Sequence, residues 1–181
     1  MPIDTFMAYA GVYGNVDDAV ADYEFIKDLH TEAGLIDAFD AAVVERKGTK
    51  TKIVKKHETP TRAGGVLGAG VGLASGLVVA LFPFAAIGGG LLVGTAAGGA
   101  VLGAVAGHAA AGMSRHDLKE LGEHLDKGTA GLVVVALADM ESNVEEAMKR
   151  AEKVERKQLK VDAAEVERDA AAASDEASTR A

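Results

Sequence analysis

Three of the five histidines and one short polar segment of this 181-residue chain have residue types and spacing that could support chemistry. His108, His116 and His124 are eight residues apart, which suggests metal ligation, but on one continuous helix successive members would lie about 80° apart. Ser114, His116 and Asp117 are the residue types of a hydrolytic triad, yet Ser114 and Asp117 are more simply explained as the cap of a following helix. We therefore expect no metal site and no catalytic site among them.

Sequence context and composition argue against several other kinds of functional site. The glycines at 88–90 and 98–99 are not preceded by a strand or followed by a Lys-Ser/Thr pair, as a phosphate loop requires. A net charge of -8 argues against nucleic-acid binding, and the absence of cysteine excludes disulfides and thiolate chemistry. We expect no enzymatic activity and no cofactor. An enzyme or small-ligand sensor is the third hypothesis, which a polar pocket on the sheet would support.

Apolar periodicity predicts an α+β protein around a glycine-rich centre. Strands are expected at 5–13, 36–45, 50–56 and 130–138, and helices at 16–33, 115–125 and 141–168. Without the centre this is the element order of a ferredoxin-like, split βαβ sandwich. Both helices would then cover one face of the sheet. We expect a dimer partner, or the long charged C-terminal helix, to cover the other face.

The chain divides by composition into five parts. We expect the ferredoxin-like domain to comprise residues 1–60 and 114–140, interrupted by an apolar helical hairpin at 61–113. A charged helix at 141–168 and a disordered tail at 169–181 follow. The start of the sequence lacks a basic segment and an early apolar run, so we expect no secretory signal.

The apolar centre is the most distinctive segment. His108 is the only ionisable residue between Ala63 and Met113, and glycine, alanine, leucine and valine predominate. The sequence predicts helices at 64–81 and 85–112, joined by a turn formed by Phe82, Pro83 and Phe84.

Glycines recur at four-residue intervals in both predicted helices, a pattern known as a glycine zipper. Each glycine costs roughly 1 kcal/mol relative to alanine inside a helix, so close helix packing must offset the loss. The residues expected to mediate helix association are Gly64, Gly68, Gly72, Gly76, Gly90, Gly94, Gly98, Gly99, Gly103 and Gly107.

This pattern fits two settings. About 20 apolar residues cross a bilayer, and lysines and arginines flank the hairpin, so it could insert into the inner membrane with both termini cytoplasmic. The basic run from Arg46 to Lys56 would then face lipid headgroups, although it also suits the solvated face of a β-hairpin. The alternative is a soluble, cytoplasmic homo-oligomer with the hairpins packed in its core. A helix pair buried within one monomer is less favoured, because the remaining domain is small.

The layout also resembles a bacterial family described as membrane proteins of unknown function, related to general stress proteins with a glycine-zipper hairpin. The resemblance covers residues 4–140. It rests on segments 5–29, 41–44 (AAVV), 64–107, 117–122 (DLKELG) and 128–132 (GTAGL). It implies a ferredoxin-like sandwich and a possible link to stress, but no reaction and no catalytic residues. The expected function is therefore a non-enzymatic, membrane-associated or self-assembling protein.

Overall fold

The computed structural model describes residues 4–34, 39–48, 50–57, 72–81, 96–137 and 141–162, together with 165, 168–169, 171–173, 175 and 179. The elements in chain order are β1 (Asp4–Tyr13), α1 (Val16–Glu32), β2 (Phe39–Lys47), β3 (Lys50–His57), α2 (Leu73–Leu81), α3 (Ala96–Ala111), α4 (Arg115–Leu125), β4 (Ala130–Leu137), α5 (Glu141–Ala147) and β5 (Lys153–Val161). The predicted mixed α+β class is confirmed.

Local sequence signals explain where the first elements begin and end. Asn15 caps α1, because its side-chain oxygen accepts a hydrogen bond from the Asp18 amide at 2.8 Å. Gly34 follows the end of α1 with φ of 68°, and Gly48 turns the chain between β2 and β3 with φ of 63°. Both conformations favour glycine, which has no Cβ.

The five strands form one antiparallel sheet in the order β3-β2-β4-β1-β5. Composition explains this order. β4 has the sequence AGLVVVAL, without a charged residue, and lies at the centre. The lysine-rich strands β3 (KTKIVKKH) and β5 (KVERKQLKV) form the edges. Lysine at a sheet edge discourages pairing with another chain.

The predicted ferredoxin-like topology is not confirmed. In that four-stranded sandwich the first and third strands are the inner pair, whereas here β2, β4 and β1 are the inner strands and β3 lies at an edge. An apolar run such as β4 needs neighbours on both sides and cover on both faces, which the central position provides. The lysine-rich β3 is better solvated at an edge.

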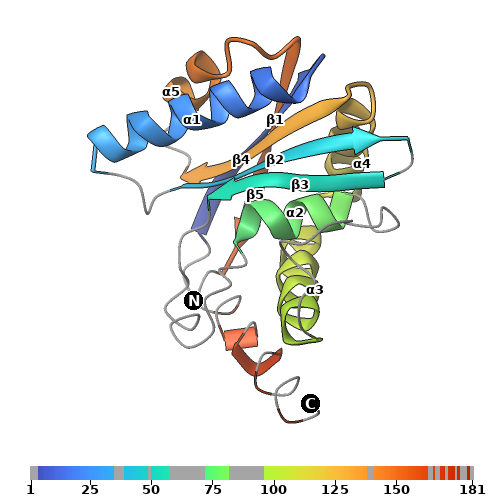
Figure 1. Cartoon of the computed structure of the whole chain (residues 1–181). Helices are drawn as coiled ribbons and strands as arrows, with labels where there is room; N and C mark the ends of the chain where they lie inside the picture. The colour runs from blue at the N-terminus through green and yellow to red at the C-terminus, as the bar shows by residue number, and fades with distance from the viewer. Residues whose placement is uncertain are drawn as a thin grey trace.

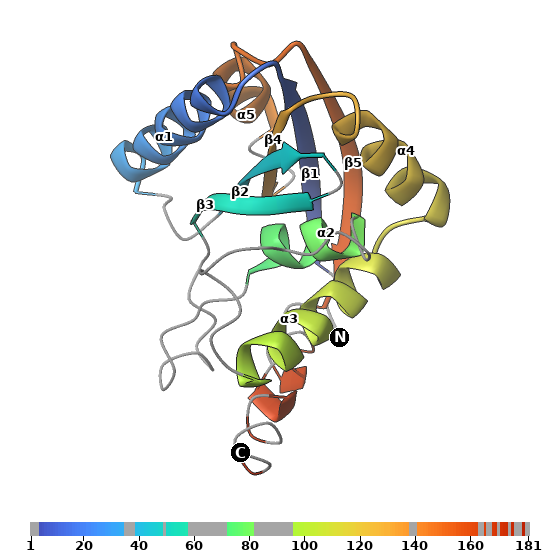
Figure 2. The same cartoon turned by 45° about the vertical axis from the view of Figure 1, so that its right-hand side comes forward.

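Helices cover both faces of the sheet (Figures 1 and 2). One face packs against α2, α3 and α4 through a first core cluster, and the other packs against α1 and α5 through a second core cluster. β4 supplies Val133 and Val135 to the first cluster and Leu132 and Val134 to the second. The chain's own helices thus provide the cover that we expected from a dimer partner.

The prediction of a long charged helix at 141–168 is wrong. α5 ends at Ala147, and the following residues form β5, which pairs with β1. In β5 the buried residues alternate: Leu159 and Val161 enter the first core cluster, while Lys160 between them is exposed. The charges that suggested helical spacing instead pair across elements, as Lys157 does with Asp117 of α4 at 3.3 Å. Pairing with β1 outweighs the local helical pattern.

The C-terminal tail also differs from the expectation of disorder at 169–181. The described residues there, which are 169, 171–173, 175 and 179, are helical. The segment is rich in alanine, the residue with the highest helix propensity.

Candidate functional site

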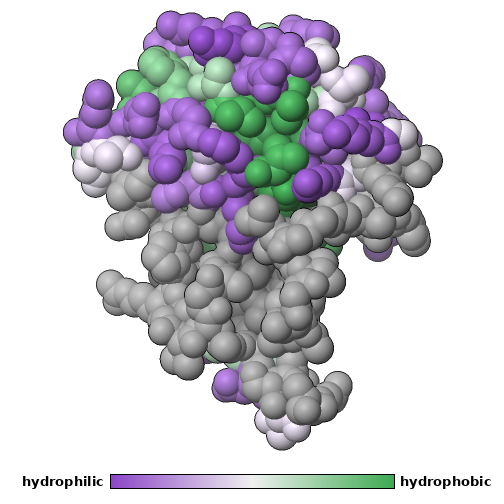
Figure 3. All heavy atoms as spheres, in the orientation of Figure 1, coloured by the Kyte–Doolittle hydropathy of each residue, from purple (hydrophilic) through white to green (hydrophobic). Residues whose placement is uncertain are grey.

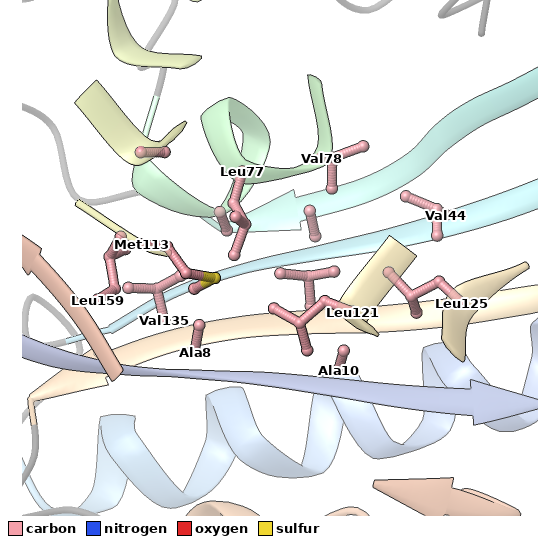
Figure 4. Close-up of a cluster of buried hydrophobic side chains, with 14 of the residues drawn as sticks. Ala8, Ala10, Val44, Leu77, Val78, Met113, Leu121, Leu125, Val135 and Leu159 are labelled. Carbon is pink, nitrogen blue, oxygen red and sulfur yellow. The ribbon is translucent and has the colours of Figure 1, made fainter. Parts of the chain in front are cut away.

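The α2 and α3 helices form the described part of the predicted hairpin. The Asp40 carboxylate of β2 accepts a hydrogen bond from the Leu73 amide at 2.7 Å, which satisfies a free N–H at the start of α2. Leu77 and Val78 of α2 are fully buried in the first core cluster. Figure 4 shows both residues on α2 among the other buried side chains of this cluster. α2 is thus docked on the α/β domain.

Gly76 marks the point where α2 and α3 approach most closely among the described glycines. A Cβ added at Gly76 would lie 2.6 Å from Val105 Cγ1, 3.1 Å from the Val105 carbonyl carbon and 3.2 Å from the Ala106 nitrogen. Two of these three atoms belong to the α3 backbone. The contact therefore requires a residue without a side chain, as small-residue helix packing does.

Gly107 has the opposite environment. It is exposed, and apart from its chain neighbours and the nearby backbone of α3, no atom of the described residues lies within 4 Å of a Cβ added there. At about 100° per residue, Gly107 and Ala111 lie on the side of α3 opposite Val105 and Ala109, which are buried. The same four-residue spacing places Gly103 and Gly99 on the stripe of Gly107. We call Gly107 and Ala111 the outer face of α3.

The other residues predicted to mediate helix association lie in different places, and several are outside the described residues. Gly72 is buried just before α2, and its carbonyl accepts a hydrogen bond from the Gly76 amide at 3.0 Å. Gly98, Gly99 and Gly103 belong to α3, but their surroundings are not described. The others lie outside the described residues, including the whole predicted turn: Gly64, Gly68, Gly90, Gly94, Phe82, Pro83 and Phe84.

Neither described helix has the length of a bilayer span. Among the described residues, no helix combines sufficient length and apolar character to cross a membrane. α2 has 9 residues and α3 has 16.

The three histidines that suggested metal ligation point to separate partners. His108 Nε2 lies 2.8 Å from Asp169 Oδ2, and His116 Nε2 lies 3.2 Å from Glu120 Oε1. His124 Nε2 donates to the carbonyls of Ala10 at 3.1 Å and Lys153 at 3.3 Å. No group of three or more potential metal-binding side chains occurs in the described part of the chain.

Ser114 and Asp117 form a helix cap. The Asp117 amide donates to Ser114 Oγ at 3.0 Å, and the Ser114 hydroxyl donates to Asp117 Oδ2 at 2.7 Å. The hydrogen bond from Ser114, followed by interaction with Lys157, holds the pKa of the Asp117 carboxyl below its usual value. The Ser114 hydroxyl thus caps the N-terminus of α4, as expected from the sequence.

A buried carboxylate in α1 was not singled out in the sequence. Asp22 is fully buried, and its Oδ2 accepts hydrogen bonds from the Tyr13 hydroxyl at 3.1 Å and the Arg150 amide at 2.8 Å. The Arg150 guanidinium donates to Oδ1 at 2.7 Å. The one available signal was position: Asp22 lies three residues after Ala19 and one before Tyr23, on the apolar stripe of the helix. Its contacts tie α1 to β1 and to the segment after α5.

Comparisons with known protein families, with curated proteins and with solved structures give no match. The function is therefore argued from the geometry of the chain alone.

Two buried histidines make stability dependent on pH. The His30 Nδ1–H donates to the Ile26 carbonyl at 2.7 Å, and the ring lies against Phe39, with centroids 4.1 Å apart. Its Nε2 is buried without a hydrogen-bond partner. Burial, with a smaller effect of His57, holds the pKa of His30 below its usual value despite the opposing effect of the Ile26 hydrogen bond. Burial likewise lowers the pKa of His124.

We expect the free energy of unfolding to fall as pH decreases. The folded state favours neutral His30, so the stability from this residue is complete above about pH 6.5 and is lost as pH falls toward its lower folded-state pKa. Urea unfolding at pH 7.5 and 5.5 measures the difference. His30→Phe should reduce that difference. The contribution of His124 to the difference should be measured separately with His124→Gln. An unchanged pH difference in the His30→Phe variant would contradict the prediction.

Proposed function

We propose that this chain is a non-enzymatic self-assembling protein, and that its copies associate through the outer face of α3. The observation that carries the proposal is Gly107, an exposed glycine inside a helix, for which no contact with the described residues of other elements explains the glycine. A glycine there costs roughly 1 kcal/mol relative to alanine. Close approach of another helix offsets that cost, as it does for Gly76 within the subunit.

The composition of α3 supports this proposal. His108 is its only ionisable residue, so the outer face offers small, uncharged side chains to a partner helix. Two copies of this face can approach with little steric hindrance because both carry Gly107 and Ala111. An isologous contact between identical faces is the commonest form of homo-oligomer.

The docking of α2 favours self-association over membrane insertion. Insertion of the hairpin would remove Leu77 and Val78 from the first core cluster and expose the sheet residues beneath them. Each such side chain contributes about 1.5–3 kcal/mol when buried. Assembly through the outer face leaves the core intact, whereas insertion requires α2 to leave it. Membrane association and the stress link suggested by family resemblance are therefore secondary to this proposal.

Substitution of Gly107 by leucine tests the proposal. Gly107→Leu places a large side chain in open space, so the subunit should keep its fold while close contact between copies is blocked. We expect the dissociation constant for self-association to increase at least about tenfold, corresponding to a loss of about 1.4 kcal/mol. Sedimentation velocity over a range of concentrations measures this constant, and circular dichroism checks the fold.

The matched control is Lys119→Leu on α4, which adds the same apolar side chain at another exposed position. Its association should match that of the unmodified chain. In a second experiment, cells that express the unmodified protein are lysed without detergent and fractionated, which shows whether the protein is recovered in the soluble or the membrane fraction. A monomer at all concentrations, or recovery of the unmodified protein only with membranes, would contradict self-assembly through α3.

A further inference from the structure

A contact between distant segments links the C-terminal tail to α3. His108 Nε2 and Asp169 Oδ2 lie 2.8 Å apart, although 61 residues separate them in the sequence. The His108 side chain is 21% exposed and that of Asp169 is 55% exposed. Both views of the fold place the C-terminal segment next to α3 (Figures 1 and 2).

The position of His108 relates this contact to the outer face. On a helical projection, Ala111 lies about 40° from Gly107, and His108 lies about 60° further in the same direction. His108 therefore borders the outer face. In the tail, Ala171 and Ala173 are partly buried, whereas Asp169 and Ala172 are exposed.

We propose that the C-terminal tail is an intramolecular competitor at the border of the outer face of α3, held there by the His108–Asp169 contact. This inference rests on the proposed function. With the tail in place, the border of the outer face is occupied and association between copies is weakened. Release of the tail frees the border and strengthens association.

The full-length variant Asp169→Asn tests this regulation. Removal of the charge weakens a partly exposed contact, so the dissociation constant for self-association should decrease about two- to fivefold. Asp175→Asn is the matched control, because it removes the same charge six residues further along the tail. Its dissociation constant should stay at the value of the unmodified chain.

Limited trypsin digestion supplies a readout independent of assembly. His108→Ala leaves the tail sequence unchanged, so cleavage after Arg168 should accelerate if the contact holds the tail. His116→Ala, on exposed α4 surface, is the control and should be cleaved at the original rate.

The outcomes separate the two proposals. Stronger association of Asp169→Asn, together with faster cleavage of His108→Ala, supports the competitor. Unchanged or weaker association of Asp169→Asn overturns it, and the proposed function still stands if Gly107→Leu blocks association of the otherwise unmodified chain. If Gly107→Leu has no effect on association, both proposals are overturned, whatever the rate of cleavage.

Discussion

Substitution of Asp22 by alanine is expected to lower the free energy of unfolding by about 2–4 kcal/mol. The carboxylate accepts three hydrogen bonds, and its loss leaves the buried Tyr13 hydroxyl without its acceptor. The Arg150 side chain is 51% exposed and can be hydrated, so the main cost arises from Tyr13 and the Arg150 amide. Urea unfolding at pH 7.5 measures the change.

Two further variants examine the origin of this effect. Asp28→Ala removes a carboxylate from an exposed position of the same helix and should change stability by less than about 0.5 kcal/mol. Tyr13→Phe combined with Asp22→Ala should cost less than the sum of the two single substitutions, because the orphaned hydroxyl is then absent. Additive costs would show that the Tyr13–Asp22 hydrogen bond does not couple the two residues.

Alanine substitution at Gly76 and at Gly107 is expected to change stability in opposite directions. At Gly76 the new methyl group would overlap Val105, so we expect a loss of about 1–3 kcal/mol. At Gly107 the methyl group enters open space and improves helix propensity, so we expect a gain of up to about 1 kcal/mol.

The two glycine variants serve as controls for each other, because the same chemical change is made on two helices of the same pair. Thermal or urea unfolding should be followed at low protein concentration, where association contributes little. Destabilisation of equal size at both positions would mean that Gly107 is also packed against the subunit. Stabilisation at Gly76 would contradict the close approach of α2 and α3.

Local patterns predicted most of the elements, because strand alternation and helix caps depend on neighbouring residues. The cap at Asn15, the turn at Gly48 and the run of β4 follow directly from sequence. β5 could not be predicted in this way. Its charged residues have helical spacing, and the strand exists because β1 offers an edge and the first core cluster accepts Leu159 and Val161.

The candidate site was only partly accessible to sequence reasoning. The four-residue glycine spacing indicated helix association, and Gly76 does lie at a contact between backbones. Spacing alone could not distinguish Gly76, which faces α3, from Gly107, which faces outward. That distinction depends on how α3 is rotated against α2 and the sheet. The contact of His108 with Asp169 joins segments 61 residues apart and leaves no local pattern.

The edges of the sheet restrict how copies of this chain can aggregate. At β5, the Lys160 amide donates to the Gly112 carbonyl at 2.9 Å, so part of that edge is already occupied by the end of α3. At the other edge, β3 has four lysines among its eight residues. Strand addition, the route to amyloid-like fibrils, is therefore hindered at both ends of the sheet. The proposed association through α3 is thus separate from the strand edges, where the backbone resists uncontrolled polymerisation.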